Sequence, residues 1–151
     1  MRIARALASL GPVGRAGPAP GTVASAVAVV AGAALMRASP RALWLAALLS
    51  LPVGWASVRR TAGADEDPGW IVIDELAGQW IAMLGLRGPG IAGLLASFAA
   101  FRALDILKPG PVGWADRRRG ALGVMGDDAV AGALAACILV TLRMARRAGR
   151  R

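Results

Sequence analysis

The chain has 151 residues, of which 56% are hydrophobic and 18% are charged, and its formal net charge is +9. A soluble monomer of this size would not cover so much apolar surface, so we expect one membrane-embedded domain that spans residues 1–151. The basic residues lie between apolar runs and tyrosine is absent, which argues against a nucleic-acid-binding protein.

Long apolar runs predict an all-α fold, a polytopic membrane bundle of about five helices. The predicted helices are residues 22–37, 42–60, 67–86, 91–107 and, starting at 127 or 128, 128–147. The third helix is predicted to begin with Asp67 as its N-cap and Pro68 at its first helical position, a combination that favours a helix start.

The polar segments of the predicted bundle gather at one end. In an up-and-down bundle, the starts of the first, third and fifth helices and the end of the fourth lie on one membrane face. The polar segments at these places are residues 20–25, 67–75, 102–108 and 127–128. Asp74 and Glu75 are predicted to lie nearly two turns inside a helix, whereas one of Asp127 and Asp128 is predicted to cap one. The sequence therefore predicts one composite site.

Five acidic residues of this site are candidate catalytic groups: Asp74, Glu75, Asp105, Asp127 and Asp128. A carboxylate at the centre of a membrane helix costs about 2.5–3.5 kcal/mol, so it persists where it pairs, binds metal or lines a wet cavity. Ion pairing with Arg102 and Lys108 is the structural alternative, but two cations do not neutralise five carboxylates. A hard divalent cation with all-oxygen ligands would supply the missing charge, which favours Mg²⁺ over Zn²⁺.

Three further residues are candidates for phosphate binding. The guanidinium group of Arg102 can form two parallel hydrogen bonds to a phosphate, and Lys108 offers a compact positive charge. The alternative for Lys108 is an ordinary interfacial lysine at a helix end, whose ammonium group extends into water. Thr22 ends the segment 17–22, whose backbone N–H groups can bind an anion at the start of the first helix. The sequence has no histidine, so neither a histidine nucleophile nor a histidine general base is available.

Four segments carry a combined pattern that is more specific than any one of them. In chain order they are PGTVAS at residues 20–25, DPGWIVIDE at 67–75, FRALDILKP at 101–109 and GVMGDDAVAG at 123–132. In residues, order and spacing this pattern resembles the phosphatidylglycerophosphatase A family. Alanines at positions 24 and 121 stand where the family usually has glycine, and none of the departures removes a charged group.

The resemblance implies hydrolysis of phosphatidylglycerophosphate to phosphatidylglycerol and phosphate, with Mg²⁺, in the bacterial inner membrane. It implies that Asp74, Glu75, Asp127 and Asp128 hold the metal against the phosphate. Arg102 and Lys108 would balance the remaining phosphate charge, and Asp105 would ligate metal or orient the attacking water. The implied partners are the lipid substrate and the membrane, and no obligate protein partner is evident.

Two other functions remain open at this point: an ion or proton carrier, and a non-catalytic helical membrane protein with the same buried carboxylates. The membrane orientation rests on counting basic residues. With the N-terminus inside, nine basic residues lie on the inner side and eight on the outer side, or three without the arginine-rich C-terminus. We therefore expect a multi-pass protein whose site faces the cytoplasm, with the basic C-terminus in conflict with this orientation.

Overall fold

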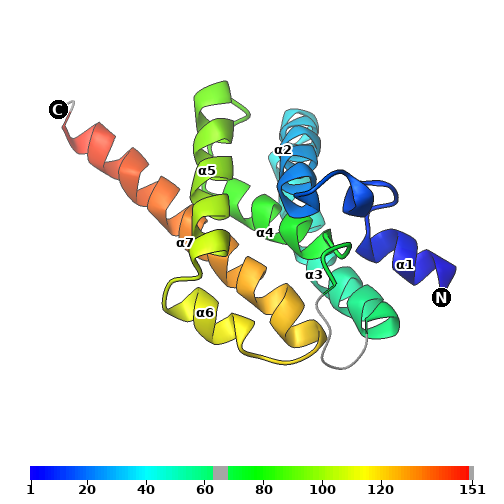
Figure 1. Cartoon of the computed structure of the whole chain (residues 1–151). Helices are drawn as coiled ribbons and strands as arrows, with labels where there is room; N and C mark the ends of the chain where they lie inside the picture. The colour runs from blue at the N-terminus through cyan, green and yellow to red at the C-terminus, as the bar shows by residue number, and fades with distance from the viewer. Residues whose placement is uncertain (63–67, 150–151) are drawn as a thin grey trace.

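The computed structural model describes residues 1–62 and 68–149, and within these ranges the protein is entirely helical (Figure 1). This confirms the predicted all-α fold. The elements are α1 (Arg2–Ala8), the short 3₁₀ helix η1 (Val13–Arg15), α2 (Pro20–Ala38), α3 (Pro40–Thr61), α4 (Ile73–Met83), α5 (Ile91–Leu107), α6 (Pro111–Asp116) and α7 (Ala121–Ala148). The short helices α1 and α6 are additional to the five predicted ones.

Three of the described helices contain segments that are long and apolar enough to cross a membrane: Pro20–Ala38, Arg41–Thr61 and Ala121–Ala148. Helices α4 and α5 have only 11 and 17 residues. At 1.5 Å per residue they are about 16 and 26 Å long, which is less than the roughly 30 Å of a hydrocarbon core. Two of the five predicted helices are therefore shorter than a full span.

The outward faces of several helices are apolar. Val30 on α2 is 72% exposed, Leu48 on α3 is 66% exposed and Leu95 on α5 is 65% exposed. Exposed aliphatic side chains spread over several helices would be costly in water, whereas lipid tails cover them without cost. The chain is therefore a membrane protein, as its composition predicts.

The interior, in contrast, is built largely from small residues. Ala24 and Ala28 on α2 and Ala131 and Ala135 on α7 are fully buried. Small side chains let helix backbones approach closely, which is the usual way in which membrane helices pack when lipid removes the hydrophobic driving force between them.

Helix α4 lies at the centre of the bundle, with α7 crossing it (Figure 1). Two side-chain hydrogen bonds fix its orientation: Trp80 Nε1 donates to the Ala28 carbonyl of α2 at 3.0 Å, and Gln79 Nε2 donates to Ser97 Oγ of α5 at 3.3 Å. Helix α4 is therefore tied by hydrogen bonds to both α2 and α5.

The predicted start of α4 is wrong. Asp67 lies outside the described residues, and the helix begins at Ile73. The preceding residues bond to another part of the chain, because the Val72 N–H donates to the Ala8 carbonyl at 2.9 Å, at the end of α1. Asp74 and Glu75 are consequently in the first turn of α4, where negative charge suits the helix dipole, and not two turns inside it.

The predicted start of α7 is wrong in the opposite direction. The polar stretch after α5 contains α6, which starts at Pro111, and α7 already begins at Ala121 after Gly120. Gly120 has a φ of 63°, a conformation that favours glycine. Asp127 and Asp128 therefore lie inside α7, about two turns from its start, so neither of them caps it.

Candidate metal and phosphate site

The crossing of α4 and α7 is made possible by two glycines. A Cβ atom on Gly132 would overlap the backbone carbonyl oxygen of Gly78, and a Cβ atom on Gly78 would lie 2.6 Å from the Asp128 carbonyl oxygen. Asp74 and Asp128 each precede one of these glycines by four residues, which is about one helical turn. The glycine contact therefore brings the acidic turns of the two helices together.

Five carboxylates form two overlapping groups at this point. Oxygen atoms of Asp74, Glu75 and Asp128 all lie within 4.8 Å of one another, and the same is true of Asp105, Asp127 and Asp128. Asp128 belongs to both groups and is only 3% exposed. All five predicted catalytic carboxylates, from α4, α5 and α7, are thus neighbours.

Two oxygens of the cluster are left unsatisfied. Glu75 Oε2 and Asp128 Oδ2 are buried and have no hydrogen-bond partner among the described residues. Burial raises the pKa of Glu75 above its ordinary value, and the negative charge of Asp105 acts in the same direction. Buried carboxylate oxygens that lack donors and face like charges fit a site for a hard cation, because Mg²⁺ and Ca²⁺ take oxygen ligands.

The two basic side chains of the site, Arg102 and Lys108, form ion pairs with carboxylates other than those of Glu75 and Asp128. Arg102 Nη1 lies 2.5 Å from Asp105 Oδ2, and Lys108 Nζ lies 2.7 Å from Asp127 Oδ2 and also pairs with Asp116. Ion pairing by Arg102 and Lys108 thus leaves the two buried oxygens described above without compensation. It does not by itself account for the whole cluster.

The start of α2 completes the site. Arg102 Nη2 lies 3.5 Å from Thr22 Oγ1, while Arg102 Nε is buried without a partner among the described residues. A Cβ atom on Gly21 would overlap the Glu75 carboxylate where it now lies, so glycine at this position gives that side chain room against the first turn of α2. The structure therefore brings all four segments of the sequence pattern together.

Lys108 adopts an unusual backbone conformation. It has a φ of 45° and ψ of 52° at the C-cap of α5, where glycine or asparagine would be less strained. Partial burial lowers the pKa of its ammonium group, but hydrogen bonds to Asp116 and Asp127 outweigh this effect, and the pKa lies above its ordinary value. Lys108 is therefore a fixed positive charge at neutral pH, held at the end of α5 in a backbone conformation that is strained for a lysine.

Asp116 is a residue that the sequence did not single out. It lies on α6, a helix that was not predicted, and pairs with Lys108. Gly78 and Gly132 were also missed as positioning residues, although the pair of glycines in otherwise apolar helices is the kind of signal that marks close helix packing.

The comparisons with known proteins identify the family of the chain. The family model for phosphatidylglycerophosphatase A matches residues 6–143. The chain is 38% identical over 124 residues to phosphatidylglycerophosphatase A of Escherichia coli K12, covering 80% of this chain and 72% of the relative. It is 32% identical over 130 residues to the protein of the same name from Haemophilus influenzae Rd, covering 83% and 80%.

A third relative has a different name. A putative phosphatidylinositol-3-phosphatase of Bacteroides thetaiotaomicron is 32% identical over 133 residues, covering 83% of this chain and 84% of the relative. No solved structure matches the chain. The family model covers all the cluster carboxylates together with Arg102 and Lys108. The chain therefore belongs to the phosphatidylglycerophosphatase A family.

Proposed function

We propose that the acidic cluster is the catalytic site at which this chain hydrolyses phosphatidylglycerophosphate to phosphatidylglycerol and phosphate, with Mg²⁺ as its cofactor. Family membership makes the chain a phosphatidylglycerophosphatase, a phosphoric monoester hydrolase. The observation that supports this location is the pair of buried oxygens, on Glu75 and Asp128, that lack partners where two groups of carboxylates overlap.

Each residue of the cluster then has a chemical role. Asp74, Glu75, Asp127 and Asp128 would hold Mg²⁺, which when bound would neutralise phosphate charge and polarise the phosphoryl oxygens. Arg102, placed between Thr22 and Asp105, would bind phosphate oxygens together with Lys108 and Thr22. Asp105 would ligate metal or orient the attacking water.

The atoms and charges of the hydrolysis balance with water as the only other reactant. Water attacks phosphorus, the bond from phosphorus to the ester oxygen of the glycerol breaks, and the leaving oxygen takes a proton. Fixed charges from Arg102 and Lys108 would stabilise the charge that develops on the phosphoryl oxygens. Such preorganised groups supply most of the catalysis in phosphoryl transfer.

Removal of divalent metal is expected to abolish turnover. Two overlapping groups of three carboxylates without a metal ion would repel a phosphate dianion. The measurement is phosphate release from phosphatidylglycerophosphate in mixed micelles by protein stripped with EDTA, followed by addition of Mg²⁺ or Ca²⁺. Recovery with Mg²⁺ is expected, and full turnover by the stripped protein would contradict the proposed metal site.

The same assay tests which lipid headgroup the protein prefers as its substrate. Because one relative is named for a phosphoinositide, phosphatidylinositol 3-phosphate is the informative second substrate. We expect faster turnover of phosphatidylglycerophosphate, as the two other relatives indicate. The carrier alternative gains no support, since the described acidic side chains gather at one end of the bundle instead of lining a path across it.

We further propose that the protein lies in the bacterial inner membrane with the acidic cluster facing the cytoplasm. The count of basic residues outside the C-terminus supports this orientation. If the three candidate spans found among the described residues all cross the membrane and no other helix does, the C-terminal end of α7 would lie on the side opposite to the start of α2.

Cysteine labelling tests this orientation. In a Cys137→Ser background, single cysteines are placed at Gly69 near the acidic end and at Gly149 after α7, where an added Cβ has free space or ordinary contacts. An impermeant maleimide added to intact cells is expected to label Gly149→Cys and to spare Gly69→Cys. The reverse pattern would place the cluster outside.

A further inference from the structure

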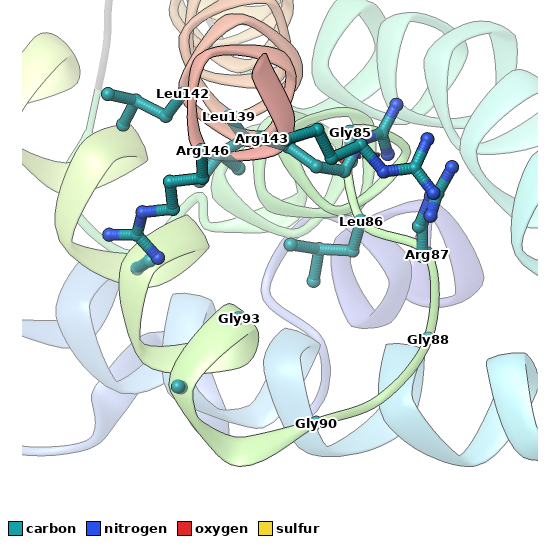
Figure 2. Close-up of a pocket in the computed structure, with 13 residues that line it drawn as sticks. Gly85, Leu86, Arg87, Gly88, Gly90, Gly93, Leu139, Leu142, Arg143 and Arg146 are labelled. Carbon is teal, nitrogen blue, oxygen red and sulfur yellow. Dashed lines mark hydrogen bonds between the residues drawn. The ribbon is translucent and has the colours of Figure 1, made fainter. Parts of the chain in front are cut away.

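A pocket lies at the far end of α7 from the acidic cluster. It has a volume of about 500 Å³ and lies between the loop after α4, the start of α5 and the C-terminal half of α7 (Figure 2). Asp128 and Arg143 are fifteen residues apart on α7, a separation of about 22 Å along the helix. The pocket is therefore distinct from the proposed catalytic site.

Four arginines line this pocket: Arg87, Arg143, Arg146 and Arg147. Among the residues that the structure describes, no acidic side chain lines the pocket. None of the ion pairs in the described part of the chain involves these arginines. The pocket is thus a concentration of positive charge that no acidic side chain in the described ranges neutralises.

The arginines surround an apolar wall. Leu86, Leu139 and Leu142 line the pocket, and Figure 2 shows Arg87 and Arg146 on opposite sides of it with Leu86 between them. Arg143 Nη1 donates to the Gly85 carbonyl at 3.1 Å, which links α7 to the loop after α4. Guanidinium groups beside leucine side chains match a ligand with a phosphate group and an attached hydrocarbon chain.

The position of the pocket along the membrane normal agrees with such a ligand. From Ala121 to Arg143 helix α7 rises by about 33 Å, close to the roughly 30 Å of a hydrocarbon core. If the start of α7 lies at one membrane face, Arg143, Arg146 and Arg147 emerge at the headgroup layer of the other. In that layer each phospholipid presents a phosphate group next to the start of its acyl chains.

We propose that this pocket binds the headgroup phosphate of an anionic phospholipid, with the upper part of an acyl chain against the leucines. The arginines would hold the phosphate through charge-assisted hydrogen bonds, and bound anionic lipid would neutralise a basic cluster that otherwise conflicts with the orientation of the chain. This site does not depend on the proposed catalytic function.

Thermal unfolding of the full chain in neutral detergent, with EDTA present so that the acidic cluster repels anions, tests the proposal. Phosphatidylglycerol in the micelle is expected to raise the midpoint by about 5 °C more than phosphatidylcholine at equal mole fraction. Arg146→Gln/Arg147→Gln should lose most of this increment, and phosphatidylglycerol retention in native mass spectra should weaken on the order of tenfold. This variant preserves the Arg143 hydrogen bond, so the fold is retained.

The matched control is Arg37→Gln/Arg41→Gln, which removes two exposed arginines from the same end of the bundle but outside the pocket. It should respond to phosphatidylglycerol like the unchanged protein. An equal increment in the pocket variant and the control would overturn the proposal. So would an equal increment with inorganic phosphate alone, because the pocket would then bind a free anion and not a lipid.

Discussion

Replacing Glu75 with glutamine is expected to lower kcat by about 10²–10³ while the protein stays folded. The amide keeps the shape of the side chain but removes the charge that a metal ion requires. In the absence of metal the substitution relieves repulsion from Asp105, which contributes to raising the Glu75 pKa, so the variant should be at least as stable as the parent in EDTA. Initial rates and thermal midpoints of the same detergent-purified samples test both statements.

A structural role for Glu75 predicts a different result. Removing one partner of a buried ion pair typically destabilises a protein by about 3–5 kcal/mol, so yield and thermal midpoint would fall together with activity. Asp116→Asn is the matched control, because Asp116 pairs with Lys108 but belongs to neither carboxylate group. We expect at most a few-fold loss of kcat there. A folded Glu75→Gln protein with near-normal kcat would refute the metal-site proposal.

The second large effect is expected from Gly132→Ala. The new methyl group would overlap the Gly78 carbonyl oxygen, and its neighbours are backbone atoms that cannot rotate away. Overpacking of this kind costs about 1–3 kcal/mol. Separation of α4 from α7 would also move Glu75 away from Asp128, and a displacement of about 1 Å at a reacting centre can cost on the order of 10² in rate. The thermal midpoint should therefore fall by several degrees and kcat should drop with it.

Gly126→Ala is the control for this substitution. Gly126 lies in the same helix, and an added Cβ would meet only the Ala115 side chain at 3.9 Å, an ordinary contact. Because alanine is a better helix former than glycine by about 1 kcal/mol, this variant should be slightly more stable than the parent. If both substitutions left stability and kcat unchanged, the close crossing of α4 and α7 would not be what positions the carboxylates.

The helical fold could be predicted from the sequence because the positions of apolar runs and of the polar segments between them do not depend on where each helix begins or ends. The ends themselves were wrong where tertiary contacts overrode local signals. Asp67 and Pro68 are typical of a helix start, yet the hydrogen bond between Val72 and Ala8 keeps the chain out of the helix until Ile73. A contact over more than sixty residues has no local signature, so no reading of the segment alone would show it.

Because of these errors, the predicted positions of the two acidic pairs in their helices were the reverse of the observed ones. Favourable placement at a helix start applies to Asp74 and Glu75, which are in a first turn, and not to Asp127 and Asp128, which are inside α7. The gathering of four segments at one end was nonetheless predicted, since it depends on the order of up and down helices and not on their exact ends. The family model and the relatives confirm the resemblance and the enzyme class.

Other features of the site could not be read from the sequence. Which carboxylate pairs with which cation depends on distances between α5, α6 and α7, and the sequence carries no direct record of them. The identity of the metal, the roles of the individual residues and the orientation in the membrane remain predictions that the experiments above test.

The small-residue interior has a consequence for how this protein tolerates mutation. In most water-soluble domains the sensitive interior positions hold large side chains, and truncation leaves a cavity. Here positions such as Ala28 and Ala131 are fully buried, and nearly every substitution at them adds volume. A saturation mutagenesis screen should therefore find its least tolerant positions among alanines and glycines, while many exposed leucines and valines exchange freely for one another in the surrounding lipid.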